Sequence, residues 1–323
     1  MTDPVITYFQ AILLGLLQGL TEFLPVSSTA HMRIASQLIY GQDAGAAFSA
    51  VAQLGPIVAI VAYFRKDLVK YVNGILRTKT PANAKNDLDA RLGWFTLLGT
   101  LPLILFGVLL EKKIDTTFRS LYFVAISLIA LALVLVLAEA VGKRNQSLKN
   151  LTLPQSQAIG WAQVLALIPG TSRSGVTISA GLFVGLDRES AARFSFLLSI
   201  PAITAAGLYK LFKVFKEHEA ANSQLGQYLV AAIVAGIVAY AVVNWFLGFM
   251  KEHTTGPFII YRIALGVVLL GLLQAGILKA KPNEAPAKPS VSISRLKPEG
   301  LVRAKAARSF GVTALAAPIP SRS

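Results

Sequence analysis

The chain has 323 residues, of which 54% are hydrophobic and 15% are charged. A typical soluble domain has about 25% charged residues, so this composition excludes an ordinary soluble globular protein. The chain has no cysteine, which excludes disulfides, thiolate metal sites and cysteine nucleophiles. Any covalent catalysis must therefore use serine, threonine, histidine or a carboxylate.

The net charge of +15 is distributed in a way that does not favour nucleic-acid binding. Residues 279–323 carry nine Lys or Arg against two Glu, and the rest of the positive charge lies mainly between apolar segments. That distribution is typical of membrane proteins, and no basic patch is interleaved with aromatic residues. Because residues 279–323 are rich in Pro, Ala, Ser and Lys, we expect a disordered basic tail.

Seven apolar segments are long enough to predict membrane helices, since about 20 apolar residues cross the hydrocarbon core. They lie at about 5–20, 46–64, 92–110, 119–140, 190–212, 226–249 and 258–278. Two further stretches, 18–40 and 160–186, are apolar but are broken by proline and small polar residues. Such backbone is tolerated in lipid only where protein buries it or where it lines a cavity, so we predict two re-entrant segments. Because no basic n-region and no A-x-A-like cleavage site is found at the start, we expect no removable signal peptide.

The two broken stretches resemble each other. Residues 18–28 read QGLTEFLPVSS and residues 163–172 read QVLALIPGTS; further on, FSAVAQLGPIVA at 48–59 matches FSFLLSIPAIT at 194–204. If each half holds one re-entrant segment and three crossings, the second half is inverted relative to the first. The predicted fold is therefore an all-α, polytopic membrane helix bundle with an inverted-topology repeat. It forms one domain, 1–278, with halves at about 5–140 and 155–278.

The charges of the short loops predict an orientation. Threading the helices places residues 65–91, 141–155 and 250–256 on one side with eleven Lys or Arg, whereas the other side has six. By the positive-inside rule the first side is cytoplasmic and both termini are external, although the basic tail argues the other way.

Four ionisable side chains lie within apolar stretches, where each costs about 2.5 to 3.5 kcal/mol, and each is therefore a candidate functional residue. They are Glu22, His31, Arg33 and Arg173. Glu22 follows Gln18 by four residues, so both lie on one helix face. His31 follows Ser28 by three, which predicts a hydroxyl and an imidazole within hydrogen-bond reach. The alternative is that these groups only support helix packing and that Glu22 only pairs with Arg173.

The second broken stretch reads PGTSRSGVT at 169–177, which predicts an anion-binding site. Gly170 and Gly175 permit tight turns, the hydroxyls donate, and the planar fork of Arg173 suits a phosphate. A helix that restarts near Gly175 would add amide donors. The alternative is that the small residues only allow close helix packing. Gln53, on an apolar segment, could reach the site, but a lone glutamine in a helix bundle is more often a structural hydrogen-bonder.

At these two motifs, QGLTEFLPVSSTAH and PGTSRSGVT, the sequence resembles the undecaprenyl-diphosphate phosphatase family of the bacitracin-resistance type, over about residues 5–278. The resemblance implies a multi-pass enzyme of the bacterial plasma membrane. Such an enzyme hydrolyses undecaprenyl diphosphate to undecaprenyl phosphate and inorganic phosphate, which recycles the lipid carrier for peptidoglycan and other envelope polymers. It also implies a divalent cation, Mg²⁺ or Ca²⁺, and a site that faces the periplasmic or extracellular side. The expected partners are the polyprenyl diphosphate lipid and the bilayer, with no nucleic acid; a homo-oligomer is left open.

Carried over position by position, the resemblance implies catalytic roles for Glu22, Ser28, His31 and Arg173, and a metal ligand at Glu22. The expected substrate-binding residues are Gln18, Ser27, Thr29, Gly170, Thr171, Ser172, Ser174 and Thr177. Gln18 stands where many members have glutamate. The acid-phosphatase type of lipid phosphatase is excluded because no histidine follows Ser172-Arg173 at the required spacing.

Two mechanisms remain open at this stage. In the favoured one Ser28 is the nucleophile, His31 or Glu22 accepts its proton, and water then hydrolyses the phosphoserine. In the other, a metal-bound or Glu22-activated water attacks directly, and Ser28 only binds phosphate. The rival function is a lipid-phosphate transporter or flippase, since inverted repeats and broken helices are also transporter architecture.

Overall fold

The computed structural model describes residues 5–41, 44, 46–116, 120–217 and 224–280, all within one compact unit, Met1–Glu284. The regular elements of these residues are all helices, and one isolated bridge between Gln146 and Leu186 takes the place of any sheet. The predicted tail lies outside the described residues from position 281 onward. Its first two residues are ordered, because Lys279 hydrogen-bonds Gln37 and the Ala280 carbonyl accepts from Leu121 N at 2.8 Å. The boundaries of the membrane domain, 1–278, stay a prediction.

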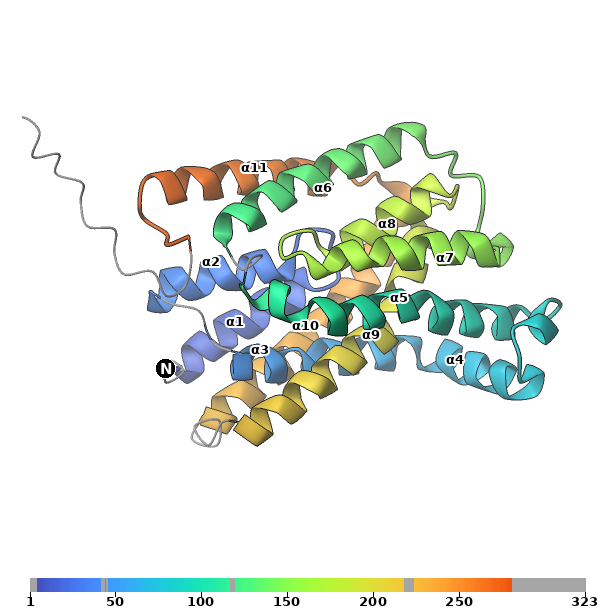
Figure 1. Ribbon diagram of the computed structural model, residues 1–323, viewed down its shortest axis with the longest axis horizontal. Helices are drawn as coiled ribbons and strands as arrows, with labels where there is room; N and C mark the ends of the chain where they lie inside the picture. Colours follow the sequence, from blue (N-terminus) through green and yellow to red (C-terminus); the bar gives the residue numbers. More distant parts are fainter. Residues whose placement is uncertain (1–4, 42–43, 45, 117–119, 218–223, 281–323) are drawn as a thin grey trace, which may run out of the picture. The chain divides into compact units, whose positions relative to one another are not determined.

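The described residues form the bundle of α-helices shown in Figure 1. The helices are α1 (Tyr8–Thr21), α2 (Ser28–Tyr40), α3 (Ala46–Ala52), α4 (Leu54–Thr78), α5 (Leu88–Thr116), α6 (Leu121–Val141), α7 (Leu153–Ala162), α8 (Arg173–Phe183), α9 (Arg188–Glu217), α10 (Leu225–Glu252) and α11 (Gly256–Gln274), with short 3-10 turns that include η4 (Gln163–Leu167).

Six helical segments of the described chain are long and apolar enough to cross a membrane: Phe48–Thr78, Leu88–Leu110, Leu121–Val141, Arg188–Tyr209, Leu225–Glu252 and Gly256–Gln274. The protein is therefore a multi-pass membrane protein. The prediction of a crossing helix at 5–20 is wrong, since α1 has only 14 residues. It ends at Thr21 because the chain turns at Pro25, whose ring cannot continue a helix, and α2 then returns.

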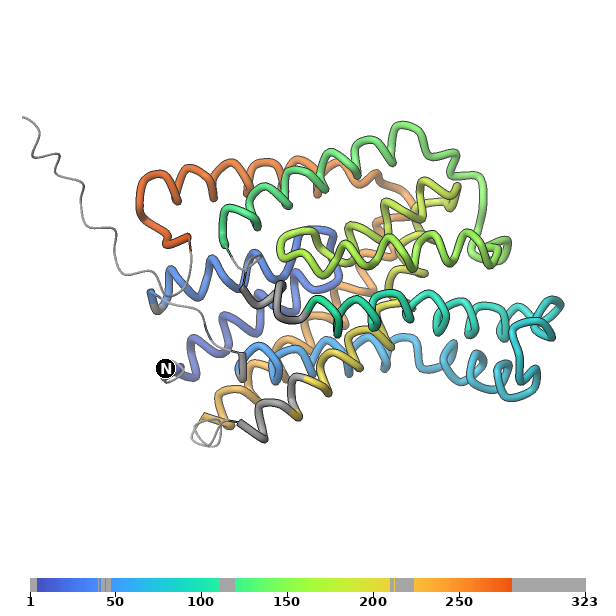
Figure 2. Tube along the Cα trace, viewed as in Figure 1, coloured from blue at the N-terminus to red at the C-terminus, as the bar shows by residue number. Residues whose placement is uncertain are grey.

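Two helical hairpins interrupt the set of long helices. The first hairpin is α1 with α2, and the second hairpin is α7, η4 and α8. Figure 2 shows that they enter the bundle from opposite ends and that their turns overlap near its middle. Each is followed by three long helical segments, as the predicted halves require; the repeat itself and its boundaries stay a prediction.

The two turns, which we call the first break (residues 22–27) and the second break (residues 168–172), end in the same way. Ser27 caps α2 by accepting from Ala30 N at 3.4 Å, and Ser172 caps α8 by accepting from Gly175 N at 3.2 Å. Both serines have positive φ, 73° and 68°, which is rare for residues other than glycine. Such strain is typical of functional sites. The helix predicted to restart near Gly175 begins two residues earlier, at Arg173.

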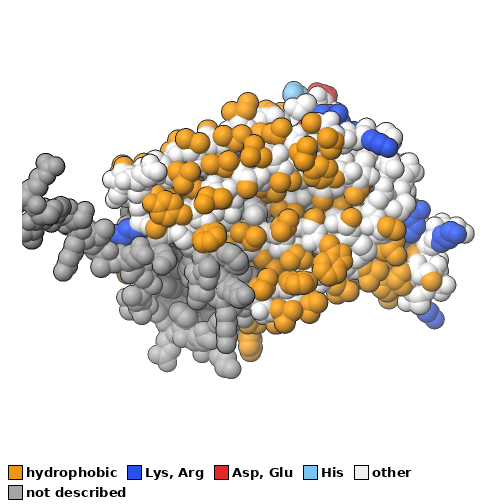
Figure 3. Space-filling model, turned by 45° about the horizontal axis from the view of Figure 1, so that its top comes forward, with side chains coloured by type: hydrophobic (Ala, Val, Ile, Leu, Met, Phe, Trp, Pro, Cys, Tyr) orange, Lys and Arg blue, Asp and Glu red, His pale blue; other side chains and the backbone are white. Residues whose placement is uncertain are grey.

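The loops lie at two ends of the bundle. Residues 79–87, 142–152 and 253–255 share one end, at the right of Figure 1, and the start of α1 and the end of α11 share the other. This matches the predicted threading. On the face drawn in Figure 3, apolar side chains cover the middle of the bundle, and Lys and Arg gather mainly at the end that carries these loops. Val108 and Ile260 are each 71% exposed, as expected of side chains that contact lipid.

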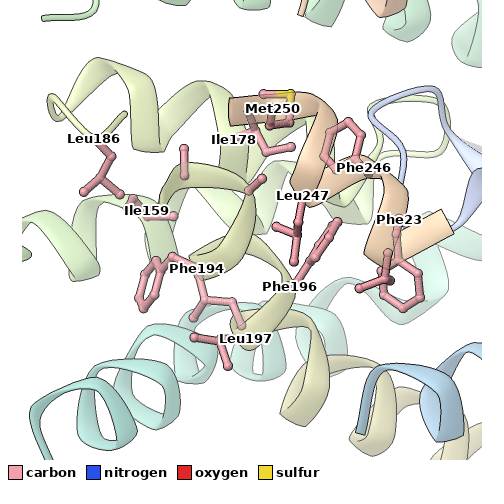
Figure 4. Close-up of a cluster of buried hydrophobic side chains, with 14 of the residues drawn as sticks. Phe23, Ile159, Ile178, Leu186, Phe194, Phe196, Leu197, Phe246, Leu247 and Met250 are labelled. Atoms are coloured by element: carbon pink, nitrogen blue, oxygen red, sulfur yellow. The ribbon is translucent and has the colours of Figure 1, made fainter. Parts of the chain in front are cut away.

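Aromatic packing fixes the first break to the long helices. Phe23 makes an edge-to-face contact with Phe196 of α9, with centroids 5.3 Å apart, and Phe196 in turn packs against Phe246 of α10. Figure 4 shows these rings in the buried cluster between the helices. Close helix approach elsewhere depends on glycine: a Cβ at Gly55 of α4 would lie 1.9 Å from the Ala232 carbonyl of α10.

Candidate active site

The two breaks meet at the carboxylate of Glu22, the residue directly after α1. Its Oε1 accepts from Arg173 Nη2 at 2.7 Å and from Gln53 Nε2 at 3.3 Å. Its Oε2 accepts from Ser28 Oγ at 2.8 Å and from Gln18 Nε2 at 3.0 Å. The Glu22 side chain is only 4% exposed. A buried carboxylate thus holds an arginine and a serine hydroxyl side by side.

Arg173 comes from the opposite hairpin and is the first residue of α8. Its side chain is 16% exposed, and the ion pair to Glu22 joins residues 151 positions apart in the chain. A second link is the Ser174 hydroxyl, which donates to the Leu24 carbonyl at 2.8 Å. These contacts hold the N-termini of α2 and α8 next to one another. Their amides and helix dipoles favour an anion at this position.

A cavity of about 170 Å³ opens beside the ion pair. Its polar lining is Glu22, Ser27, Ser28, Thr29, Gln53, Ser172 and Arg173. The remaining lining is apolar: Leu103, Ala166, Leu167, Ala202, Ile203 and Ala206 come from α5, η4 and α9, and Ile168 and Gly170 come from the second break. One cavity therefore offers both a place for a phosphate and a surface for a hydrocarbon chain.

Several of the predicted site residues do not line this cavity in the described structure. Thr171 donates to the carbonyls of Leu165 and Ile168, and Thr177 donates to the Arg173 carbonyl and contacts Ser195 Oγ at 2.6 Å. These two hydroxyls stabilise the turn and the helix packing. Gln18 and Ser174 act on the breaks through the contacts given above. Arg33 is buried in α2, away from the cavity lining.

The predicted contact between His31 and Ser28 is absent among the described residues. His31 Nδ1 lies 2.8 Å from the Ser27 carbonyl, and Nε2 lies 2.6 Å from the Tyr261 hydroxyl of α11. Because a carbonyl only accepts, Nδ1 carries a proton and donates it to Ser27, while Nε2 shares a hydrogen bond with the Tyr261 hydroxyl. The imidazole therefore fixes the strained Ser27 backbone, and of the two bases considered for Ser28, only Glu22 contacts it.

Two residues at the site were not predicted from the sequence. Gln53 was interpreted as structural, yet the interruption between α3 and α4 places it on the cavity. Arg262, within the apolar segment predicted at 258–278, was not among the predicted residues; its side chain is fully buried and contacts both breaks. The cost of a charge in an apolar segment would have identified it.

The donor set at the cavity suits a hard cation. It consists of one carboxylate, several hydroxyls and the amide of Gln53, all oxygen ligands of the kind that Mg²⁺ and Ca²⁺ prefer. The described residues contain no group of three or more His, Cys, Asp or Glu that could hold a metal. Gln18, which hydrogen-bonds Glu22, provides an amide and not a second carboxylate. Mg²⁺ commonly binds through one or two carboxylates together with substrate phosphates. The site thus fits a cation that a diphosphate helps to hold.

Comparisons with known proteins agree with this geometry. Curated relatives named undecaprenyl-diphosphatase include proteins from Pelodictyon phaeoclathratiforme, 49% identical over 282 residues, and Prosthecochloris aestuarii, 46% identical over 279. A third, from Renibacterium salmoninarum, is 45% identical over 275 residues. Each alignment covers 84% of this chain and at least 98% of the relative. A family model described as bacitracin resistance protein BacA matches residues 11–268, and the chain belongs to this family.

Proposed function

We propose that the protein hydrolyses undecaprenyl diphosphate to undecaprenyl phosphate and inorganic phosphate, as the names of its relatives indicate for them. The observation that carries the proposal is the meeting of Glu22, Ser28 and Arg173 in one cavity whose lining changes from polar to apolar. The polar part takes the diphosphate and the apolar part takes the first units of the prenyl chain. The transporter alternative is not favoured, because the relatives carry the name of an enzyme.

Arg173 binds the terminal phosphate, and Glu22 holds the Ser28 hydroxyl. The terminal phosphate competes with Glu22 for the guanidinium, whose fork can bind a phosphate with two parallel hydrogen bonds. When Arg173 turns to the phosphate, the Glu22 carboxylate loses its strongest partner and keeps the Ser28 hydroxyl, 2.8 Å away. A base within hydrogen-bond reach of the hydroxyl is the geometry that nucleophilic catalysis needs.

The proposed chemistry has two steps. Ser28 Oγ attacks the terminal phosphorus and its proton passes to Glu22, while the bridging P–O bond breaks and undecaprenyl monophosphate leaves with the electron pair. Water then attacks the phosphoserine, Ser28 Oγ leaves and takes back the proton from Glu22, and inorganic phosphate departs with the release of one proton from water. The leaving monophosphate is a weak base, so no acid is needed to protonate it, which agrees with the location of His31 outside the cavity lining. Direct attack by water activated by Glu22 is the competing mechanism.

Glu22, with the hydroxyls and the Gln53 amide of the cavity, would help to hold a divalent cation, Mg²⁺ or Ca²⁺. The cation would supply positive charge to the transferring phosphoryl group. Arg173 and the helix N-termini supply the charge that comes from the chain itself.

We also propose that the protein lies in the bacterial plasma membrane with residues 79–87, 142–152 and 253–255 in the cytoplasm. The Lys and Arg residues in and near these loops support this orientation. The substrate would then enter from the periplasmic or extracellular side.

Release of inorganic phosphate from a polyprenyl diphosphate by the purified protein in detergent, with a Mg²⁺ titration, tests the function. Arg173→Lys keeps the charge but loses the planar fork, so we expect turnover to fall by about 100-fold, the scale of one lost transition-state donor. Release of no phosphate by folded wild-type protein, combined with lipid-phosphate movement across liposomes, would favour the transporter. Turnover like that of the wild type in Arg173→Lys would reject the role of the guanidinium.

A further inference from the structure

Arg262 of α11 is completely buried, and in the described structure all its hydrogen bonds go to backbone carbonyls. Nη1 donates to the Pro25 carbonyl at 3.1 Å, and Nη2 donates to the carbonyls of Gly170 at 3.2 Å and Thr171 at 3.1 Å. Two further hydrogen bonds go to backbone carbonyls of α6. Nε donates to the Leu128 carbonyl at 3.2 Å, and Nη2 donates to the Ser127 carbonyl at 3.4 Å. Burying a guanidinium without a carboxylate is costly, so its location is informative.

The carbonyls of Pro25, Gly170 and Thr171 belong to the two breaks, where the backbone is not helical. Pro25 precedes the serines that begin α2, and Thr171 directly precedes Ser172 and Arg173. One guanidinium therefore binds both hairpins just before their site residues. Its planar fork has fixed donor directions, so it sets the spacing between the two breaks more rigidly than a flexible ammonium would.

The bond to Thr171 also determines where a second group points. In a trans peptide the carbonyl and the following N–H point in opposite directions, and no peptide of the described chain is cis. The Thr171 carbonyl is directed at Arg262, so the N–H of Ser172 is directed away from it. Ser172 lines the cavity and Arg262 does not.

We propose that Arg262 is a positioning residue of the phosphate site. It holds the two breaks at a fixed spacing and orients the Thr171–Ser172 peptide so that the Ser172 N–H donates a hydrogen bond to the terminal phosphate. Ser172 has a positive φ of 68°, a conformation that is rare for residues other than glycine and typical of functional sites. The inference rests on the proposed function, because the phosphate that receives the bond belongs to that substrate.

The first test compares Arg262→Lys and Arg262→Gln with a matched control, Arg188→Lys. Arg188 forms a two-pronged ion pair with Glu139, at 3.0 and 2.8 Å, and Glu139 also accepts from Thr255 N in the loop 253–255. Thermal unfolding, kcat and KM are measured for each folded variant. We expect both changes at 262 to lower kcat by about 30-fold or more with little change in KM, since the lost alignment acts in the transition state. The control should lose stability and keep its kcat. A folded Arg262→Lys with kcat within about threefold of the wild type would overturn the proposal.

The second test needs no variant and so remains decisive if Arg262 variants do not fold. Amide hydrogen exchange of residues 168–175 is measured in wild-type protein with and without a methylenediphosphonate analogue of a short prenyl diphosphate. We expect slower exchange at Ser172 when the analogue binds. Unchanged exchange at Ser172 with bound analogue would contradict the proposal. Failure of the proposed function is recognised separately, as the absence of phosphate release from the folded wild type.

Discussion

Replacing Glu22 with glutamine removes the negative charge that the two breaks share and keeps the size of the side chain. Four donors converge on the carboxylate, at 2.7, 2.8, 3.0 and 3.3 Å. The amide retains one acceptor oxygen, and its NH₂ faces groups that also donate. Arg173, 16% exposed, is left without a counter-charge, and breaking a buried ion pair in this way costs about 3 to 5 kcal/mol.

The same change removes the base that contacts Ser28. General base catalysis contributes about 10²- to 10⁴-fold, so we expect turnover of Glu22→Gln to fall by about 1,000-fold at saturating substrate. Phosphate release is measured per folded molecule, with the folded fraction taken from thermal unfolding followed by tryptophan fluorescence. The matched control is Gln53→Leu, which removes the 3.3 Å hydrogen bond to the same carboxylate and one amide oxygen from the cavity lining, but leaves the charge of Glu22. A folded Glu22→Gln protein with turnover within about tenfold of the wild type would refute the assignment of Glu22 as the base.

Two further predictions concern stability and the tail. Gly55→Ala should destabilise the protein by about 1 to 3 kcal/mol, because its Cβ would lie 1.9 Å from the Ala232 carbonyl; Gly248→Ala, which meets nothing within 4 Å, is the control, and equal thermal midpoints for the two would contradict the packing argument. A stop codon after Ala280 should preserve phosphatase activity, because the family match ends at residue 268 and the membrane unit keeps the contacts of Lys279 and Ala280. A stop codon after Gly276 removes the hydrogen bonds of Lys279 and Ala280 and should lower the thermal midpoint. Complete loss of activity in well-folded protein that ends at Ala280 would show that the tail contributes to the site.

Much of the site can be predicted from the sequence by one rule: a charged side chain in an apolar stretch is costly and therefore marks a candidate functional residue. Glu22 and Arg173 were found in this way, and the structure brings them to 2.7 Å. The packing alternative, that Glu22 pairs with Arg173, describes a real contact as well. That pair shares its carboxylate with Ser28 and borders the cavity, so the contact by itself does not make the site merely structural.

The partner of Ser28 could not be predicted from spacing. An interval of three residues brings Ser28 and His31 into contact only if both side chains point along the same helix face and neither binds another partner. The strained Ser27, at φ 73°, begins α2 so that the Ser28 hydroxyl turns back to Glu22. His31 instead binds Tyr261, which is 230 residues away in the chain. A contact of that kind depends on how α11 packs, and no local pattern encodes it.

The length of α1 could not be predicted from the pattern of apolar residues either. Residues 5–20 are apolar enough to suggest a crossing, but α1 shares its hairpin with α2 and packs closely on α10. A Cβ at Gly19 would lie 2.6 Å from the Ala235 carbonyl, so α1 is held against another helix rather than surrounded by lipid. Composition cannot distinguish these two environments, since both are apolar.

The most direct test of the central claim is to trap the phosphoenzyme at Ser28. Wild-type protein is mixed with a polyprenyl diphosphate labelled in its terminal phosphate, quenched in acid within milliseconds, digested and analysed by mass spectrometry. The account predicts a transient phosphate on Ser28, its absence in Ser28→Ala, and a loss of turnover by orders of magnitude in that variant. No acid-stable label at any time, together with a folded Ser28→Ala protein that keeps about a tenth or more of the rate, would contradict it and would establish attack by water.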